Sequence, residues 1–553
     1  ITGIALAGGI DSSGNNFGEV VPSSLAGTVV VDDDNDGVAD GGEVGISGVV
    51  ITLTGTDDFG QAVSETAATD GSGDYSFDDL RPGTYTVTET QPVANLDGSE
   101  SPGTAGGSVT ANDEISGIVL IPGTTATDYD FGELAGSSIS GEVLDELGNP
   151  IDGVTLTLTG TDDLGDPVSL TTRTDSLGQY GFPSLRPGTY TVVETQPVGF
   201  GDGGGNTVAG IALAPNGVRD DVDFVETLGS LAAVVYQDDS NDGVQDGGEV
   251  GIAGVGVTLT GTDDRGNAVN ITTSTAPDGS VLFDNLISGS YTLTEAQPAS
   301  YVDGIDVAPD GGANGTAGND VVSGIAIAGG EDVATALFGE VPGASITGTV
   351  TDENGAPIGG VTITVTGTDD LGNPVNVVVT TGPDGSYVFD GLRPGSYSVS
   401  ESQPAGYGDG GSNVISVTLT PGDAETGVDF VELLASISGS VFNDLNANGV
   451  RDLGEPGIAG VDVDLSGTDA NGAAVALTVS TDSNGDYLFD DLIGGTFDLT
   501  ESQPAGFADG LENANGHGTA AQDDTVTGIA LAGGADLSGV TFGEVNEASI
   551  AAS

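Results

Sequence analysis

Carboxylates recur three times in this chain at the spacing of a calcium-binding loop. In residues 32–43, acidic side chains occupy positions 1, 3, 5, 9 and 12 of a twelve-residue segment, and Gly37 occupies position 6. Ca²⁺ takes six to eight oxygen ligands, so side chains from alternate residues of a tight turn must converge on it. Glycine at position 6 permits the bend, a backbone carbonyl at position 7 adds an oxygen, and a glutamate at position 12 binds through both oxygens. The spacing therefore predicts a calcium site.

Related loops follow at 238–249 and 444–455, and the same six positions of each loop are the expected ligands. They are Asp32, Asp34, Asp36, Val38, Asp40 and Glu43; Asp238, Ser240, Asp242, Val244, Asp246 and Glu249; and Asp444, Asn446, Asn448, Val450, Asp452 and Glu455, the valines acting through their carbonyls. Serine and then two asparagines replace aspartates, so the loops carry five, four and three carboxylates. Because ligand charge helps to set affinity, we expect calcium binding to weaken in that order. The alternative is a solvated acidic turn, but five such carboxylates repel one another without a cation.

Three further sets of acids lie in Gly-, Asn- and Asp-rich stretches later in the same copies. They are Asp97, Glu100 and Asp113; Asp303, Asp306 and Asp320; and Asp509, Glu512 and Asp523. Additional cation sites and solvated surface loops are both open interpretations. The paired acids of the Gly-Thr-Asp-Asp motif are more typical of turns. The arginines of Leu-Arg-Pro-Gly (Arg81, Arg186 and Arg393) are expected to pair with the acidic surface.

Composition excludes several classes of function. The 553 residues include 85 acidic and 7 basic residues, a net charge of −78, and every basic residue is an arginine. Such a chain repels nucleic acid and anionic membrane surfaces, and cations are its natural partners. It has no cysteine and therefore no disulfide, and its apolar runs are too short to span a bilayer. With one histidine (His517) and no lysine or cysteine nucleophile, we expect no enzymatic activity.

Internal repetition dominates the sequence. The motif Gly-Thr-Asp begins at residues 55, 160, 261, 367 and 467, and alternate copies lie 206 or 207 residues apart. The chain therefore alternates two domain types, and only the longer type carries the acidic loop. We expect long-type domains at 21–134, 229–342 and 435–545 and short-type domains at 135–228 and 343–434. The short type replaces the loop by a compact turn.

Each repeat has the alternation of short strands and turns that is typical of a β-sandwich. In the fourth copy, strands are expected at 345–350, 361–365, 375–381, 387–389, 397–401 and 414–420, with a last strand ending at Phe430. About seven short strands with turns between them, in roughly 90–110 residues, are typical of a sandwich. No segment shows sustained helical periodicity. The predicted fold is all-β, a tandem array of five Ig-like sandwich domains.

The two ends do not follow this domain count. Residues 1–20 match the last strands of the long type, since Phe17-Gly18-Glu19-Val20 corresponds to Phe542-Gly543-Glu544-Val545. Residues 546–553 match the start of a short-type domain. We expect these strands either to belong to a longer array or to complete neighbouring subunits, because an isolated strand pair is not stable.

Longer motifs resemble a known family. The acidic loop is followed by Gly-[Ile/Val]-x-Gly-Val-x-[Val/Ile]-x-Leu-[Thr/Ser]-Gly-Thr-Asp, then by Thr-Asp-x-x-Gly-x-Tyr-x-Phe-Asp-x-Leu and Gly-x-Tyr-x-Val-x-Glu-x-Gln-Pro. This pattern resembles the B-type repeats of serine–aspartate repeat surface proteins, relatives of the collagen-adhesin B domain. The resemblance is specific for the long copies, whereas the short copies are closer to the generic prealbumin-like type. It implies prealbumin-like sandwiches that act as calcium-stiffened stalk modules.

One departure from the family bears on mechanism. Many collagen-adhesin-type B domains carry a lysine-based isopeptide cross-link promoted by a buried acid. The glutamate of Glu-x-Gln-Pro is present here at residues 89, 194, 295, 401 and 501, but without lysine that cross-link cannot form. Calcium bound to the acidic loops is then the main remaining cross-link that we expect to stabilise the domains.

These observations together predict a function. We expect an extracellular or cell-surface rod, or a self-assembling filament or surface-layer component, in which calcium stiffens each long-type domain against the preceding domain. Expected partners are copies of the same chain, through end strands or lateral contacts. An adhesin stalk that displays a separate ligand-binding domain and the accessory repeats of a secreted enzyme are the alternatives.

Overall fold

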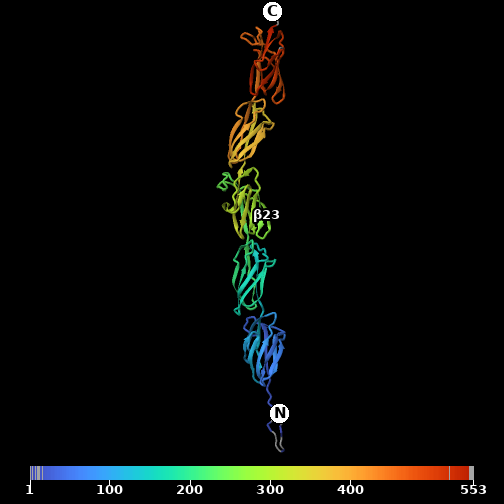
Figure 1. The fold of residues 1–553 in the computed structure, drawn as a ribbon, viewed down its shortest axis with the longest axis vertical. Coiled ribbons are helices and arrows are strands. Elements are labelled where there is room, and N and C mark those ends of the chain that lie inside the picture. The colour runs from blue at the N-terminus through green and yellow to red at the C-terminus, as the bar shows by residue number, and fades with distance from the viewer. Residues whose placement is uncertain are drawn as a thin grey trace.

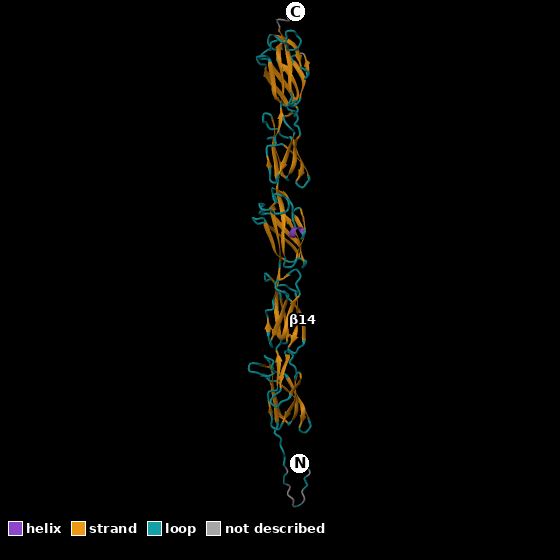
Figure 2. Cartoon of the chain, turned by 90° about the vertical axis from the view of Figure 1, so that its left-hand side faces the viewer, coloured by secondary structure: helices purple, strands orange, loops and turns teal. Residues whose placement is uncertain are grey.

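Five β-sandwiches follow one another along a rod, with the N-terminus at one end and the C-terminus at the other (Figures 1 and 2). The structure is a computed structural model that describes residues 2, 4–5, 8, 13–14, 16–521 and 523–546. Its ten sheets pair as two in each domain. Each domain buries a hydrophobic cluster of its own. The sandwiches and their count agree with the sequence prediction.

The first domain has a six-stranded sheet, in which β1 pairs with β2, β5, β10 and β11 and β11 pairs with β7, and a five-stranded sheet in the order β4-β3-β6-β9-β8. Along β1, buried and half-exposed residues alternate, because one face of the strand packs on the core. The strands are β1 (Ser23–Val31), β2 (Val44–Gly45), β3 (Val50–Asp57), β4 (Ala62–Ala68), β5 (Asp74–Leu80), β6 (Gly83–Glu89), β7 (Leu96–Ser101), β8 (Ser108–Ala111), β9 (Glu114–Leu120), β10 (Thr125–Ala126) and β11 (Asp130–Leu134).

The second and fourth domains are the short type. The second contains β12 (Ser137–Asp145), β13 (Thr155–Asp162), β14 (Pro167–Arg173), β15 (Gln179–Leu185), β16 (Gly188–Glu194), β17 (Gly201–Asp202), β18 (Thr207–Leu213), β19 (Val218–Arg219) and β20 (Phe224–Thr227). The fourth contains β30 (Ala344–Asp352), β31 (Thr362–Asp369), β32 (Pro374–Thr380), β33 (Ser386–Leu392), β34 (Gly395–Glu401), β35 (Gly408–Asp409), β36 (Val414–Leu419), β37 (Ala424–Glu425) and β38 (Phe430–Leu433). The expected strands of the fourth copy all overlap observed ones, except that the last begins at Phe430. The two-residue strands β35 and β37 were not expected.

The third and fifth domains repeat the long type. The third contains β21 (Gly229–Gln237), β22 (Gly256–Asp263), β23 (Ala268–Ser274), β24 (Ser280–Leu286), β25 (Gly289–Glu295), β26 (Tyr301–Asp303), α1 (Pro309–Gly312), β27 (Thr316–Gly318), β28 (Val321–Ile327) and β29 (Asp332–Pro342). The fifth contains β39 (Ala435–Asn443), β40 (Asp462–Asp469), β41 (Ala474–Ser480), β42 (Asp486–Leu492), β43 (Gly495–Glu501), β44 (Phe507–Asn513), β45 (Thr519–Ala521), β46 (Thr525–Leu531) and β47 (Asp536–Asn546). Among the described residues, no helix is long and apolar enough to cross a membrane.

The first and last strands of each domain lie side by side and run parallel. In the first domain, Val29 of β1 is in register with Phe131 of β11, about a hundred residues away. The close packing there requires glycine, since a Cβ on Gly27 would lie 1.8 Å from the carbonyl oxygen of Tyr129. Because β1 runs the length of the sandwich before the acidic loop begins, at about 3.3 Å per residue, the loop lies at the end of the domain opposite to where the strand enters.

Among the described residues that precede Ser23, none is assigned to a strand. Residues 16–22 have no assigned secondary structure, although their sequence matches a last strand. The predicted start of a further domain at 546–553 lies outside the described residues, apart from Asn546.

Candidate metal centres

The first acidic loop is organised around the carboxylate of Asp32, which is fully buried. Its Oδ2 accepts the Gly37 N–H at 2.7 Å, and its Oδ1 accepts the Asn35 N–H at 2.6 Å. Gly37 has a φ of +80°, and a Cβ there would lie 3.0 Å from the backbone of Glu100. The glycine at position 6 is therefore required both by the left-handed turn and by the neighbouring strand β7.

The glutamate at position 12 closes the loop. The Glu43 carboxylate accepts the N–H of Asp33 at 3.1 Å and that of Asp40 at 2.7 Å. The other two loops repeat this arrangement, with Glu249 bonded to the N–H groups of Asp239 and Asp246 and Glu455 bonded to those of Leu445 and Asp452. Asp238 and Asp444 also accept the N–H of their position-6 glycines, at 2.9 and 2.7 Å. The three loops thus share one backbone cradle.

Carboxylates crowd together in the first loop. Oxygens of Asp32, Asp34 and Asp36 all lie within 4.8 Å of one another. The neighbouring charge of Asp36 raises the pKa of Asp34, and burial raises the pKa of Glu43. Such a set of hard oxygen donors fits Ca²⁺ in both donor type and spacing. The side chain of Val38 is exposed, so that residue offers only its backbone.

In the third loop, side chains of the loop itself donate hydrogen bonds to one of its carboxylates. The side-chain amides of Asn446 and Asn448 both donate to Asp452 at 2.9 Å and lower its pKa. In the second loop, the Ser240 hydroxyl donates to Asp238 at 3.3 Å. Each replacement of an aspartate therefore adds a hydrogen-bond donor where the first loop has a negative charge. The order of calcium affinity stays a prediction.

A second carboxylate group lies beside each loop. Its shared members are the glutamate of Glu-x-Gln-Pro, the glutamate of the last strand and the aspartate of the late stretch, namely Glu89, Glu133 and Asp113; Glu295, Glu340 and Asp320; and Glu501, Glu544 and Asp524. Asp97, Glu100 and Asp113 also meet, as the sequence indicated. The late acids therefore converge rather than remaining scattered on the surface. The glutamates of the last strand were missed from sequence; their recurrence in Phe-Gly-Glu was the available signal.

The two glutamates of this group form a buried pair in every domain. Burial, followed by the charge of Glu133, raises the pKa of Glu89 to about 10, and the corresponding pKa values of Glu295 and Glu501 are also raised to about 10. The Gln91 side chain donates to Glu133. The short domains contain the same pair, Glu194 with Glu226 and Glu401 with Glu432. The pair is therefore an element of the fold in which burial raises the pKa of a glutamate, and each long-type domain adds an aspartate whose carboxylate oxygen lies within 4.8 Å of both glutamates.

One member of the late set that the sequence grouped with Asp509 and Glu512 differs by one residue from the aspartate that joins the second group. The sequence assigned Asp523, but Asp524 meets Glu501 and Glu544. Backbone register decides this, because the Glu501 N–H bonds to the carbonyl of Asp524 just as the Glu89 N–H bonds to the carbonyl of Asp113. The Asp523 N–H instead donates to Asp509 at 3.2 Å.

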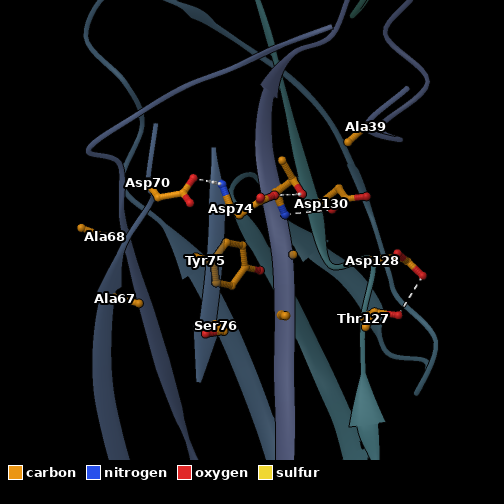
Figure 3. Close-up of a pocket in the computed structure, with 13 residues that line it drawn as sticks. Ala39, Ala67, Ala68, Asp70, Asp74, Tyr75, Ser76, Thr127, Asp128 and Asp130 are labelled. Atoms are coloured by element: carbon orange, nitrogen blue, oxygen red, sulfur yellow. Dashed lines mark hydrogen bonds between the residues drawn. The ribbon is translucent and has the colours of Figure 1, made fainter. Parts of the chain in front are cut away.

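Other candidate groups serve structural roles. Asp57 accepts the N–H groups of Phe59 and Gln61 at 2.9 and 2.8 Å, as a turn-forming residue does. A shallow groove of about 600 Å³ on the first domain is lined by Asp70, Asp74 and Asp130 (Figure 3). Its carboxylates already accept hydrogen bonds, since Thr28 donates to both Asp74 and Asp130.

The acidic ends of the first and third domains face the domain that follows each of them. Across the first junction, the Asn35 side chain donates to Asp163 at 3.3 Å and the Asn216 side chain donates to Asp33 at 2.5 Å. Arg186 donates to the carbonyl of Asp97 at 2.6 Å while it pairs with Asp163 at 2.7 Å. The expectation that the loop would stiffen the preceding junction is therefore wrong. The length of β1 carries the loop to the far end of the sandwich.

The fold and the repeated acidic ends define an array of loop-bearing prealbumin-like sandwiches. Comparison with protein families finds the SdrD B-like domain at residues 23–132, 229–328 and 435–535, and the chain belongs to this family. The two intervening domains match the carboxypeptidase regulatory-like domain at 138–223 and 345–431. The alternation expected from sequence is thus reflected in two family matches. Family membership also confirms that the chain is a structural repeat segment and not an enzyme.

Two curated relatives share much of the array. Serine-aspartate repeat-containing protein F of Staphylococcus epidermidis is 30% identical over 444 residues, which cover 72% of this chain and 24% of the relative. Serine-aspartate repeat-containing protein D of Staphylococcus aureus strain Newman is 34% identical over 304 residues, which cover 50% of this chain and 22% of the relative. The chain thus spans about a quarter of the length of these relatives.

Solved structures with similar folds include the Bacillus anthracis TIE protein and a streptococcal ancillary pilin. The first has a TM-score of 0.31 at 15% identity and covers 76% of each chain. The second has a TM-score of 0.26 at 17% identity and covers 53% of this chain and 99% of the pilin.

Proposed function

We propose that this array is a calcium-stiffened stalk segment of an extracellular or cell-surface protein. The observation that carries the proposal is the first junction, where residues of the acidic loop itself bond to the next domain. Asn35 and Asp33 belong to the loop, and both contact the second domain. The third domain repeats the contact through Asn241 and Asp370 at 2.8 Å. A cation that fixes the loop would thereby fix the orientation of the following domain.

Charge makes the cation necessary for a rigid junction. The first loop, the second carboxylate group and Asp163 of the following domain all gather at this end of the domain. Charges of one sign destabilise a compact arrangement through mutual repulsion, and a bound Ca²⁺ supplies the largest local positive charge. Without it, the surrounding arginines are too few to balance the acids. We therefore infer that the junctions after the first and third domains loosen when calcium is removed.

A stalk also fits the relationship to the staphylococcal proteins, since the array corresponds to only part of their length. In this function, the segment holds another part of its parent protein away from the cell surface. Self-association through end strands remains a further prediction of the same proposal, and a filament would require it.

Electron microscopy of the full chain tests this function directly. We expect straight rods in calcium and bent, variable particles after chelation. Glu43→Gln combined with Glu249→Gln should produce bent particles even in calcium, whereas the exposed control Glu65→Gln in β4 should not. Rods that stay straight after chelation would contradict calcium stiffening. Side-by-side or end-to-end polymers in calcium would support filament formation, and isolated rods at all concentrations would contradict it.

A further inference from the structure

The residue after the conserved leucine of the Leu-Arg-Pro-Gly motif lies at the junction with the preceding domain. From the second domain onward, its identity depends on whether that preceding domain is the long or the short type. Arg186 and Arg393 face long-type domains, where each guanidinium donates to a backbone carbonyl, of Asp97 and Asp303 respectively. The same position holds isoleucine, at 287 and 493, where the earlier domain is the short type. There the Ile287 side chain packs closely against Gly199, since a Cβ added to Gly199 would lie 2.4 Å from it. Arginine at this position thus donates to the preceding domain, whereas isoleucine packs against the backbone of the preceding domain.

The first domain differs from the other long-type domains at this position. It is a long-type domain, yet it carries Arg81 at the position where the other long-type domains carry isoleucine. Arg81 pairs with Asp58 at 2.8 Å, just as Arg186 pairs with Asp163 and Arg393 with Asp370 at 2.7 Å. The start of this domain is therefore built like the start of a short-type domain.

A neighbouring turn of the first domain also resembles a short-type domain. The first domain has Pro122-Gly123, corresponding to Pro421-Gly422 of the fourth domain, where the other long-type domains have paired glycines at 329–330 and 533–534. The Gly123 N–H bonds to the carbonyl of Val21 at 3.0 Å, and the Gly422 N–H bonds to the carbonyl of Pro342 at 2.9 Å. The latter bond lies at a junction with a long-type domain.

The surface around Arg81 is uncovered compared with its counterparts. The Arg81 side chain is 38% exposed, whereas Arg186 and Arg393 are each 15% exposed. Its partner Asp58 is 35% exposed, against 21% for both Asp163 and Asp370. The ion pair is thus preformed, and it is more exposed than the two pairs that face a preceding long-type domain.

The residues that lead into this surface indicate the type of that neighbour. Phe17-Gly18-Glu19 repeats the last-strand motif of long-type domains, whereas the short type has valine at the middle position, as in Val225. Glycine is needed there because a Cβ on Gly132 would lie 2.5 Å from Oδ2 of Asp32, the first ligand position of the loop. Phe17 is 73% exposed, although its counterpart Phe131 is fully buried. The sequence of this segment therefore suits a domain that has an acidic loop.

We propose that the end of the first domain formed by Asp58, Arg81 and Gly123 is a docking surface for the loop-bearing end of a long-type domain whose last strand begins at Phe17. Arg81 donates to the backbone carbonyl at the position of Asp97, and Asp58 accepts from an asparagine at the position of Asn35. This inference goes beyond the proposed function because it specifies the neighbouring domain type and does not require calcium binding.

An extended chain tests the docking surface. A second copy of residues 23–130 is fused directly before residue 17 of the chain, so that residues 17–20 supply its last strand. Arginine-selective chemical modification, followed by mass spectrometry, then compares Arg81 with Arg186 and Arg393. In the original full chain we expect Arg81 to react several-fold faster than the other two. In the extended chain its rate should fall to theirs.

A matched control carries residues 137–223, from a short-type domain, in place of the long-type copy. We expect this control to leave Arg81 reactive. Equal protection by both copies, or no protection by the long-type copy, would overturn the proposal. Far-UV circular dichroism and the increase in particle length report whether each copy folds. A long-type copy that fails to fold would contradict the assignment of residues 17–20 as its last strand.

Discussion

The guanidinium of Arg186 donates from Nη1 to the carbonyl oxygen of Asp97 at 2.6 Å, across the boundary between the first two domains. The same guanidinium pairs with Asp163 of its own domain, and Asp163 in turn accepts a hydrogen bond from Asn35 of the acidic loop. One arginine therefore links strand β7 of the first domain to Asp163 of the second, and Asp163 in turn contacts the loop. The junction, rather than an isolated loop, is the unit that this array repeats.

Removal of the bridging arginine should loosen the junction without unfolding either domain. Charge-assisted hydrogen bonds contribute about 1.5–3 kcal/mol each, so Arg186→Ala is expected to weaken closure of the first junction by about that amount. Small-angle X-ray scattering of the full chain in calcium should show a broader distribution of particle lengths. Arg219→Ala is the control, since Arg219 pairs with the exposed Asp221 of its own domain. An unchanged distribution for Arg186→Ala would contradict this role.

The three loops should differ in calcium affinity. We expect the first loop to bind most tightly and the third most weakly, because the number of carboxylates falls and the Asn446 and Asn448 amides already hydrogen-bond to an Asp452 oxygen. Full-length variants that keep one loop intact and carry glutamine at position 12 of the other two allow each loop to be titrated by calorimetry. Tightest binding by the loop at 444–455 would refute the order.

The buried glutamate pairs should make the calcium-free protein less stable as the pH rises. Burial, and then the charge of Glu226, raises the pKa of Glu194 to about 8 from an ordinary value of 4.5. Between these two pKa values Glu194 holds a proton in the folded domain that it has lost in the unfolded chain. Its contribution to the free energy of unfolding is therefore complete below pH 4.5 and is lost as the pH rises through 8. Urea unfolding in chelator, followed by proteolysis and mass spectrometry of peptides from 137–228, should show a falling midpoint over this range.

Glu194→Gln provides the matched test of that slope. Glutamine keeps the shape and a hydrogen-bond donor for Glu226 but does not titrate in this range. The variant should therefore show a flatter dependence of unfolding on pH in the second domain, whereas the fourth domain, which retains Glu401, keeps its slope. Parallel slopes in the two domains would show that the pair does not set the pH dependence.

Glycine at the crossing of the first and last strands should be indispensable. Gly27→Ala places a Cβ at 1.8 Å from the Tyr129 carbonyl, whereas a Cβ on Gly41 meets no atom within 4 Å. Overpacking costs about 1–3 kcal/mol and occasionally more, and we expect Gly27→Ala to reach the upper end because backbone must move. Thermal unfolding of the first domain within the full chain should reveal the loss, with Gly41→Ala unchanged.

Local patterns predicted the sandwich and the position of each loop in the sequence, because strand alternation, turn residues and loop spacing are all encoded within about a dozen residues. The end of the domain that carries the loop depends instead on how far β1 extends, and the sequence argument placed it against the wrong neighbour. Glu133 joins Glu89 only because β11 returns beside β1. Asp524 replaces Asp523 through a one-residue difference in register. Each of these features requires knowledge of strand pairing over long separations.

The distance between the first two domains, measured by pulsed electron spin resonance, tests the central claim most directly. The chain has no cysteine, so spin labels can be introduced at cysteines replacing Ser64 and Ser169, which are exposed on equivalent strands of adjacent domains. A second pair at Ser169 and Asn270 spans the junction that has no acidic loop. We predict a narrow distance distribution for the first pair in calcium that broadens on chelation, and no change for the second pair. A first pair that stays narrow without calcium, or equal broadening of both pairs, would contradict calcium stiffening of the loop-bearing junctions.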